Sequence, residues 1–358
     1  MCDRFGYGWE AHEVETEDGW FVTVFRITQA NGQDLTKSDK PPILLQHGSA
    51  QSAFEWLGYS PLGPTLPGQL AERGYDVWVA NSRGKLYSNT NRNAATETLA
   101  EHWDFSAREM ALYDTPAFVT KVLETTGKPK LTLMAFSHGG LVFYLALAQE
   151  QDWYAERVHR YVALAACAYP IAKHQDYEEN VLMYLTFDEL GITNMWGGDA
   201  ASMNDENCKL VGGNLCTLNS VSSGQAVSIK VWMYMNQLGL AGRLQEPIEL
   251  ADWAAGQTLS DPIELSKIDR IPVSIVHAIS DEICDPVGAE YTYAQIQSEE
   301  KYIRFEHGGH QLFKYETKSS YTDRIVETIE TGTIVNVGIN SFVSSFSAMA
   351  MLLISATI

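Results

Sequence analysis

A single serine stands where a strand must turn sharply into a helix. Ser137 lies in the segment AFSHGG, after the apolar run 130–136 and before the small-residue run 139–150. A tight strand-to-helix turn that presents a serine hydroxyl needs small residues two positions before and after the serine. Ala135 and Gly139 meet that need, with alanine where glycine is more usual. We interpret Ser137 as a nucleophile; the alternative is a structural serine in the same kind of turn.

A nucleophilic serine also needs donors for the oxyanion that its attack creates. The backbone N–H of His138, at the start of the expected helix, is one candidate. The second donor should come from the loop after the apolar run 42–46, where we choose the Ser49 N–H. His47 in that loop is expected to pack beneath the site without transferring protons.

The serine hydroxyl further requires a base, and the base requires an acid that orients it. In chains with this turn, the order is serine, acid, histidine. His307 and His310, in FEHGGHQLF, are the late histidines, and the two glycines between them allow a loop to approach the serine closely. Asp281 is the first carboxylate after the apolar run 272–278 and is therefore the expected acid. Asp285 precedes a proline and is expected to cap the next helix.

These residues follow apolar runs that alternate with helical patterns, which predicts βα units and a mainly parallel sheet. Active sites in such sheets lie at the carboxyl ends of the strands. An initial hairpin is expected over residues 11–28, turning at Asp18-Gly19. Further strands are expected at 42–46, 75–80, 130–136, 160–166, 272–278 and 301–306, with helices at 64–73, 106–126 and 139–150.

The stretch 169–262 breaks this alternation and is rich in Tyr, Met, Trp, Asn and Gly. We interpret it as a cap inserted between two parts of the core, 1–168 and 263–330. Its aromatic and Met side chains either line an apolar substrate pocket or form the cap's own core. Residues 331–358 form a separate apolar tail, and its uncharged end, 341–358, predicts either a membrane or lipid anchor or a terminal helix.

Composition narrows the function further. The formal net charge of −20 repels phosphate backbones, so nucleic-acid partners are not expected. The five cysteines form no CxxC pair, so no metal is expected; Cys208 and Cys216 either close a small disulfide loop or remain free thiols. The first 20 residues lack the basic and apolar segments of a signal peptide, and the chain has no Asn-x-Ser/Thr site.

Several segments together resemble the acid lipases, the gastric and lysosomal group. They are TEDGWFVTVFRI, LLQHGSAQSAFEWL, GYDVWVANSRGKLYS, HWDFSAREMALYDTPAFV, FSHGG, LSKIDRIPVSIVHAISDEICDP and HGGHQLF, in family order over roughly residues 7–330. The resemblance implies an α/β-hydrolase fold, with a mainly parallel sheet flanked by helices and an inserted cap.

The same resemblance implies a triad of Ser137, Asp281 and His310, with the Ser49 and His138 amides as the oxyanion hole. His310 follows Asp281 by 29 residues, which fits the family better than His307 does. Leu312 stands where the family usually has Asp, and the cap looks shorter. No cofactor is implied, and the expected partner is a lipid ester, met at a lipid interface. A secretory, lysosomal or membrane-anchored location is also implied, and oligomeric state is left open.

The expected activity is therefore a lipase or carboxylic ester hydrolase for acylglycerols or sterol esters. One alternative is a carboxylesterase for short soluble esters, which a shorter cap would suit. A second is a peptidase or amidase on the same fold. A third, of another class, is a catalytically silent lipid-binding protein, whose mark would be a broken triad; all three positions are intact here.

Overall fold

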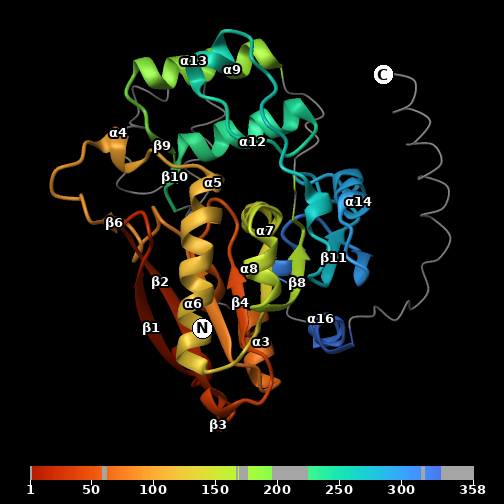
Figure 1. Ribbon diagram of the computed structural model, residues 1–358. Coiled ribbons are helices and arrows are strands. Elements are labelled where there is room, and N and C mark those ends of the chain that lie inside the picture. Colours follow the sequence, from red (N-terminus) through yellow and green to blue (C-terminus); the bar gives the residue numbers. More distant parts are fainter. Residues whose placement is uncertain are drawn as a thin grey trace.

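A large, mostly parallel sheet forms the centre of the computed structural model, which describes residues 2–58, 63–166, 168, 176–195, 225–315 and 319–331. The strand order is β1-β2-β5-β4-β7-β8-β11-β12 (Figure 1). From β5 to β12 all neighbours are parallel, whereas β2 runs antiparallel to β1 and to β5. The predicted mainly parallel sheet and its opening hairpin are confirmed. The strands are β1 (Gly8–Glu15), β2 (Trp20–Ala30), β4 (Ile43–Gln46), β5 (Val77–Asn81), β7 (Leu131–Phe136), β8 (Val158–Leu164), β11 (Val273–Ala278) and β12 (Lys301–Glu306), with short β3 (Gln33–Asp34) and β6 (Thr90–Asn91) pairing with β2.

The inner strands are apolar at every position because both faces of the sheet are covered. Along β7, Leu133 and Ala135 pack into one core cluster, and Met134 and Phe136 pack into the cluster on the opposite face. This is the pattern of strands in parallel sheets, whose two faces both lie against helices. It explains why continuous apolar runs, rather than alternating ones, marked these strands in the sequence.

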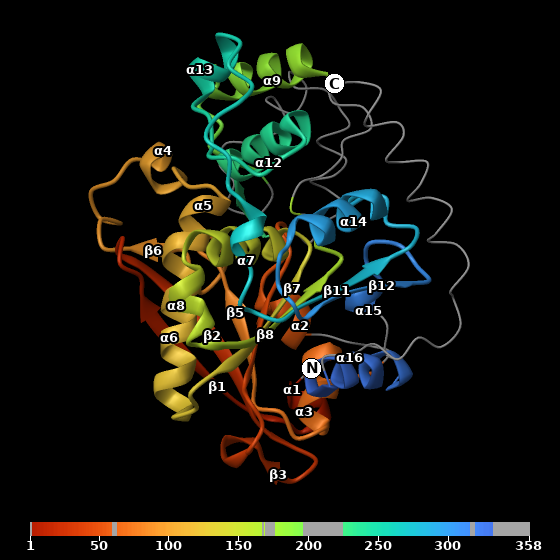
Figure 2. The same ribbon diagram turned by 45° about the vertical axis from the view of Figure 1, so that its right-hand side comes forward.

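Helices lie on both faces of this sheet (Figure 2). One face is covered by α5 (Ala107–Glu109), α6 (Thr115–Thr126), α7 (His138–Gln149) and α8 (Gln151–Ala155), and the other by α2 (Ala53–Leu57), α3 (Leu66–Glu72) and α16 (Ser319–Thr331). The remaining core helices are α1 (Cys2–Phe5), α4 (Leu99–His102), α14 (Pro286–Gln295), α15 (Leu312–Tyr315), and the 3-10 turns Leu35–Lys37 and Leu265–Lys267.

The helix predicted over residues 106–126 is present, but it is not uniform. Ser106 caps its start with a capping box, as expected for the N-cap position. A π-helical turn then occupies Met110–Asp114 before α6 begins. Such turns insert one residue and are frequent near functional sites. Here the turn places Asp114 against Arg83, whose guanidinium is 1% exposed and also binds Asp18 in the first hairpin.

Three helices from the predicted cap lie beyond the carboxyl ends of the strands: α9 (Tyr177–Glu189), α12 (Ile229–Ala241) and α13 (Leu250–Ala254), at the top of Figure 1. Their described aromatic and Met side chains pack together: Tyr184, Met233 and Trp253 are buried in the cluster that also covers the sheet. These three side chains therefore pack into the main core, and a substrate pocket lined by the cap stays a prediction. A two-stranded pairing, β9 (Asn194–Met195) with β10 (Val227–Ser228), completes this part.

The predictions for the cysteine pair and for the C-terminal tail fall outside the described residues. Cys208, Cys216 and the apolar tail 341–358 are among the residues not described. Cys284 is disulfide-bonded, so the five cysteines are not all free thiols. Over the described ranges, every helix is too short or too polar to span a bilayer.

Candidate active site

The turn between β7 and α7 holds Ser137 in a backbone conformation that few residues adopt. Its φ of 55° and ψ of −126° are strained for a residue with a side chain, and α7 begins at the next residue. The following glycines make the turn possible. A Cβ on Gly139 would lie 2.4 Å from the His47 carbonyl oxygen, and one on Gly140 would lie 2.1 Å from the Ala166 Cβ.

The structure brings Ser137, His310 and Asp281 together from three separate loops. His310 Nε2 lies 2.9 Å from Ser137 Oγ, and His310 Nδ1 lies 2.9 and 3.0 Å from the two carboxylate oxygens of Asp281. All three side chains are buried. His307, the other late histidine, is exposed and does not join them. The arrangement has the hydrogen-bond geometry by which a base deprotonates a serine and a carboxylate orients that base.

The turn after β11 fixes the carboxylate of Asp281. Its Oδ1 accepts hydrogen bonds from the N–H groups of Ile283 and Cys284, at 3.0 and 2.8 Å. Asp285 caps α14 by accepting from the Val287 N–H, which confirms its predicted capping role. Two backbone N–H groups therefore orient the carboxylate of Asp281.

The loop after β12 brings His310 to that carboxylate. A Cβ on Gly309 would lie 2.9 Å from the Glu282 carboxylate oxygen, so glycine allows the close approach. Glu282 in turn accepts from the His310 N–H at 3.2 Å. The ring of Phe136 lies 5.0 Å from the imidazole, centroid to centroid. Backbone, carboxylate and aromatic ring together limit the orientations open to the imidazole.

The proposed oxyanion donors lie on the two elements that flank Ser137. His138 is the first residue of α7, where N–H groups have no partner inside the helix. Ser49 follows Gly48, whose Cβ position would lie 3.3 Å from the Ser137 Cβ. His47 supports this loop from below: its Nδ1 donates to the Gly48 carbonyl and its Nε2 accepts from the Ser82 N–H. Burial lowers the pKa of His47 to about 3, so the ring stays neutral, as its loop role requires.

Two residues near the site escaped the sequence analysis. His277, on β11, donates to the Cys284 carbonyl at 2.7 Å, and its Nε2 lies 3.5 Å from Asp281. Lys85, on the loop after β5, is 2% exposed and contacts the Ser49 carbonyl. Neither has a spacing signal. Lys85 stands out because buried lysines are rare, and its burial can be recognised only from the structure.

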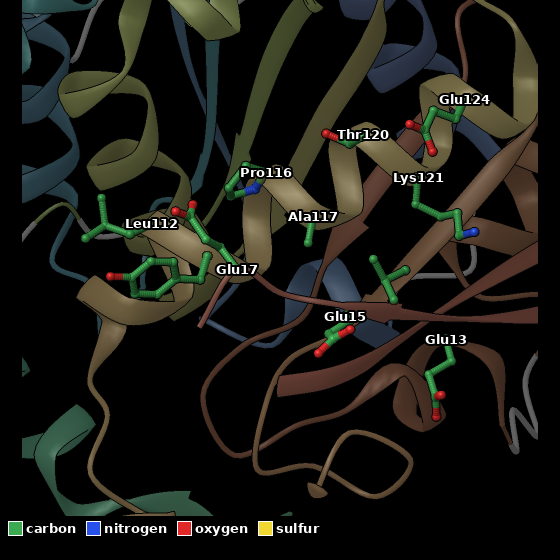
Figure 3. A pocket seen from close by; sticks show the side chains of 11 residues that line it. Glu13, Glu15, Glu17, Leu112, Pro116, Ala117, Thr120, Lys121 and Glu124 are labelled. Atoms are coloured by element: carbon green, nitrogen blue, oxygen red, sulfur yellow. The ribbon is translucent and has the colours of Figure 1, made fainter. Parts of the chain in front are cut away.

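A pocket of about 430 Å³ lies elsewhere, between β1 and α6 (Figure 3). Four of its lining residues are acidic, namely Glu13, Glu15, Glu17 and Glu124, and the rest include Lys121 and apolar side chains. None of the triad residues lines it. It lies at the β1 edge of the sheet, and β2, β5 and β4 separate β1 from β7, the strand that precedes Ser137.

Among the described residues, one group has donor atoms close enough to hold a metal ion: Asp281, Cys284 and His310. These atoms do not fit a metal. The sulfur of Cys284 is disulfide-bonded, so it offers no thiolate. The Asp281 carboxylate and the His310 Nδ1 already bind each other.

The sheet order, the antiparallel second strand and the serine turn after β7 define an α/β-hydrolase fold. Residues 41–200 match the family described as alpha/beta hydrolase fold, and residues 1–59 match the partial alpha/beta-hydrolase lipase region. Among solved structures, the α/β hydrolase GrgF from Penicillium sp. sh18 aligns with a TM-score of 0.58 at 14% identity, covering 91% of this chain and 99% of that chain. A Paleococcus ferrophilus monoacylglycerol lipase aligns with a TM-score of 0.50 at 16% identity, over 82% and 96% of the two chains. Both likenesses show the fold.

Within that class, the resemblance to the acid lipases is confirmed. Mouse lipase member K is 32% identical over 202 residues, which cover 55% of this chain and 50% of the relative. Rat gastric triacylglycerol lipase is 34% identical over 168 residues, 47% and 42% of the two chains. Lipase 1 of Drosophila melanogaster is 37% identical over 171 residues, 47% and 36%. The chain thus spans about half the length of these relatives, or less.

Proposed function

We propose that this protein is a serine ester hydrolase that acts on lipid esters, with acylglycerols or sterol esters as substrates. The observation that carries the proposal is the continuous hydrogen-bonded chain from Ser137 Oγ through His310 to Asp281. It lies at the carboxyl ends of the strands, where α/β folds place their sites. The named lipase relatives supply the substrate class.

The proposed reaction has two steps. His310 takes the Ser137 proton while Oγ attacks the ester carbonyl carbon, and the Ser49 and His138 N–H groups stabilise the oxyanion. His310 then gives its proton to the departing alkoxide, so an alcohol leaves and the acyl group stays on Ser137. Water, deprotonated by His310, attacks the acyl carbon and releases the fatty acid with Ser137 restored. Asp281 stabilises the imidazolium in both steps.

The described cap helices support a lipid substrate. Two leucines of α9, Leu182 and Leu185, are 66% and 40% exposed, whereas Val181, Tyr184 and Phe187 of the same helix are buried. We propose that the fatty acyl chain is held beneath the cap. A short acyl chain would need little contact with the cap. The dependence of the rate on acyl chain length therefore separates a lipase from an esterase for short soluble esters.

The test is hydrolysis of p-nitrophenyl esters from acetate to palmitate, followed by triolein and cholesteryl oleate. We expect wild-type activity to rise toward long chains. Ser137→Ala should reduce activity to background, and Asp281→Asn should reduce kcat by roughly 10³- to 10⁴-fold, since the imidazole loses its orienting carboxylate. Ser298→Ala is the matched control, because Ser298 is also buried but lies between α14 and β12.

Each contrary outcome has a distinct meaning. Activity confined to acetate and butyrate would replace the lipase by a carboxylesterase with the same triad. Amide cleavage at rates comparable with esters would favour a peptidase or amidase. Equal activity in wild type and Ser137→Ala would remove Ser137 from the mechanism.

A further inference from the structure

A buried lysine joins the oxyanion-hole loop to the cap. The Lys85 side chain extends from the loop after β5, and its Nζ donates to the Ser49 carbonyl at 2.7 Å and to the Ala226 carbonyl at 2.6 Å. Ser49 carries one of the proposed oxyanion donors. Ala226 immediately precedes β10 and α12, so it belongs to the described part of the cap. One ammonium group thus touches both.

Further hydrogen bonds define the same junction. The Gln225 N–H donates to the Ala50 carbonyl at 3.3 Å, and the Gln225 side chain accepts from the Leu86 N–H at 3.2 Å. The cap segment 225–226 therefore lies along the oxyanion-hole loop and is bonded to it and to the Lys85 loop. Among the described residues of this junction, Lys85 is the one whose side chain bonds to both the oxyanion-hole loop and the cap segment.

A lysine is a costly choice for a purely structural bond. Burying an ammonium group carries a penalty of several kcal/mol unless its donors are satisfied. Burial lowers the pKa of Lys85 to about 7, while the carboxylate of Glu55 on α2 favours the charged form. In the described part of the chain, the other titratable groups that interact with it are His47 and His138, both held neutral by burial. A positive charge beside the oxyanion donors would also favour a developing negative charge there.

We propose that Lys85 is a positioning residue that fixes the Ser49 backbone in the oxyanion hole and fastens the cap segment Gln225–Ala226 to it. The Ser49 carbonyl belongs to the residue whose N–H is the proposed donor, so holding the carbonyl limits rotation of that backbone. Seating of the cap and alignment of the donor are then coupled through one side chain. This inference rests on the proposed function, because it assumes the oxyanion hole of that reaction.

The test compares Lys85→Met with Lys301→Met. Lys301 is the matched control, since its Nζ also donates to two backbone carbonyls, those of Tyr293 and Ile296, but at the start of β12. With p-nitrophenyl butyrate, Lys85→Met should lower kcat by roughly 10- to 100-fold with KM within about twofold, less than the loss of a whole oxyanion donor. Lys301→Met should leave both constants near wild type.

Paraoxon provides a second readout that a merely structural role would not change. It phosphorylates an active serine and places its phosphoryl oxygen in the oxyanion hole. The inactivation rate constant of Lys85→Met should fall in parallel with kcat. Equal kcat and equal paraoxon rates in Lys85→Met and Lys301→Met would overturn the inference, as would a change in KM alone.

A milder variant covers the case in which Lys85→Met does not fold. Gln225 is partly exposed, and Gln225→Ala removes the side-chain bond to the Leu86 N–H but keeps the backbone bond to the Ala50 carbonyl. We expect a several-fold fall in kcat and in the paraoxon rate; unchanged values would overturn the coupling. Wild type that reacts neither with paraoxon nor with any ester would instead refute the proposed function itself.

Discussion

Two buried histidines beside the serine make the stability of the protein depend on pH. Burial lowers the pKa of both His47 and His138 to about 3. In the unfolded chain each returns to its ordinary value near 6.5. Between pH 3 and pH 6.5, these two histidines are therefore protonated in the unfolded chain but neutral in the folded protein. Their contribution to stability is therefore complete above pH 6.5 and is lost as the pH falls toward 3.

We accordingly predict that the free energy of unfolding decreases below pH 6.5, by up to about 1.4 kcal/mol per pH unit for each histidine. His138→Gln should reduce this slope by about one proton, because glutamine does not titrate. The His138 Nε2 has no hydrogen-bond partner within the described residues, so glutamine removes no bond there. Urea unfolding at pH 5, 6, 7 and 8 measures both slopes. Parallel slopes in the two proteins would contradict the assignment.

At the scale of elements, the contact between α7 and the end of β8 decides whether the serine turn can form. A Cβ on Gly140 would lie 2.1 Å from the Ala166 Cβ and 3.1 Å from the Tyr161 hydroxyl. Real atoms do not approach so closely, so either the helix or the strand end must move. The serine turn directly precedes the first residue of α7 and would move with that helix.

Gly140→Ala should therefore destabilise the protein by about 1–3 kcal/mol, the usual cost of overpacking, and should lower kcat for p-nitrophenyl butyrate. Ala166→Gly removes the opposing methyl group. The double variant should be more stable than Gly140→Ala alone, although each single change is unfavourable. Thermal unfolding of the four proteins gives the coupling. Strictly additive effects would mean that the two residues do not meet.

The elements were also the part of the structure that could be predicted best from the sequence. Runs such as 130–136 and 272–278 are apolar throughout because both sheet faces are buried, and each matches its strand to within a residue. The π-helical turn at Met110–Asp114 was not predicted, since an inserted residue leaves the helical pattern nearly unchanged. The candidate site residues could be named because each follows a strand. Lys85 could not, because its contacts depend on loops more than 30 residues away in the chain.

At the scale of the whole molecule, net charge should govern how the protein meets a lipid surface. The formal charge of −20 gives the protein a negative field that opposes docking on anionic lipid. Salt screens such a field over about 8–10 Å at physiological ionic strength.

Hydrolysis of triolein should therefore be slower in emulsions stabilised with phosphatidylglycerol than in those stabilised with phosphatidylcholine. The difference should shrink as NaCl rises from about 0.02 to 0.3 M, because the Debye length shortens. The soluble p-nitrophenyl butyrate serves as the control, and its rate should change little. If the rates on the two emulsions still differ at high salt, specific lipid contacts rather than net charge cause the preference for phosphatidylcholine.

The position of β12 at one edge of the sheet has a consequence for the order in which the protein is made. β12 pairs only with β11 among the described strands, and the loop after it carries His310, 173 residues after Ser137. A growing chain can thus complete the strands around the serine long before the base exists. During synthesis the nucleophile is present but unactivated, and it stays so until the end of the sheet has emerged from the ribosome. In the proposed mechanism, the growing chain therefore cannot attack esters before its fold is nearly complete.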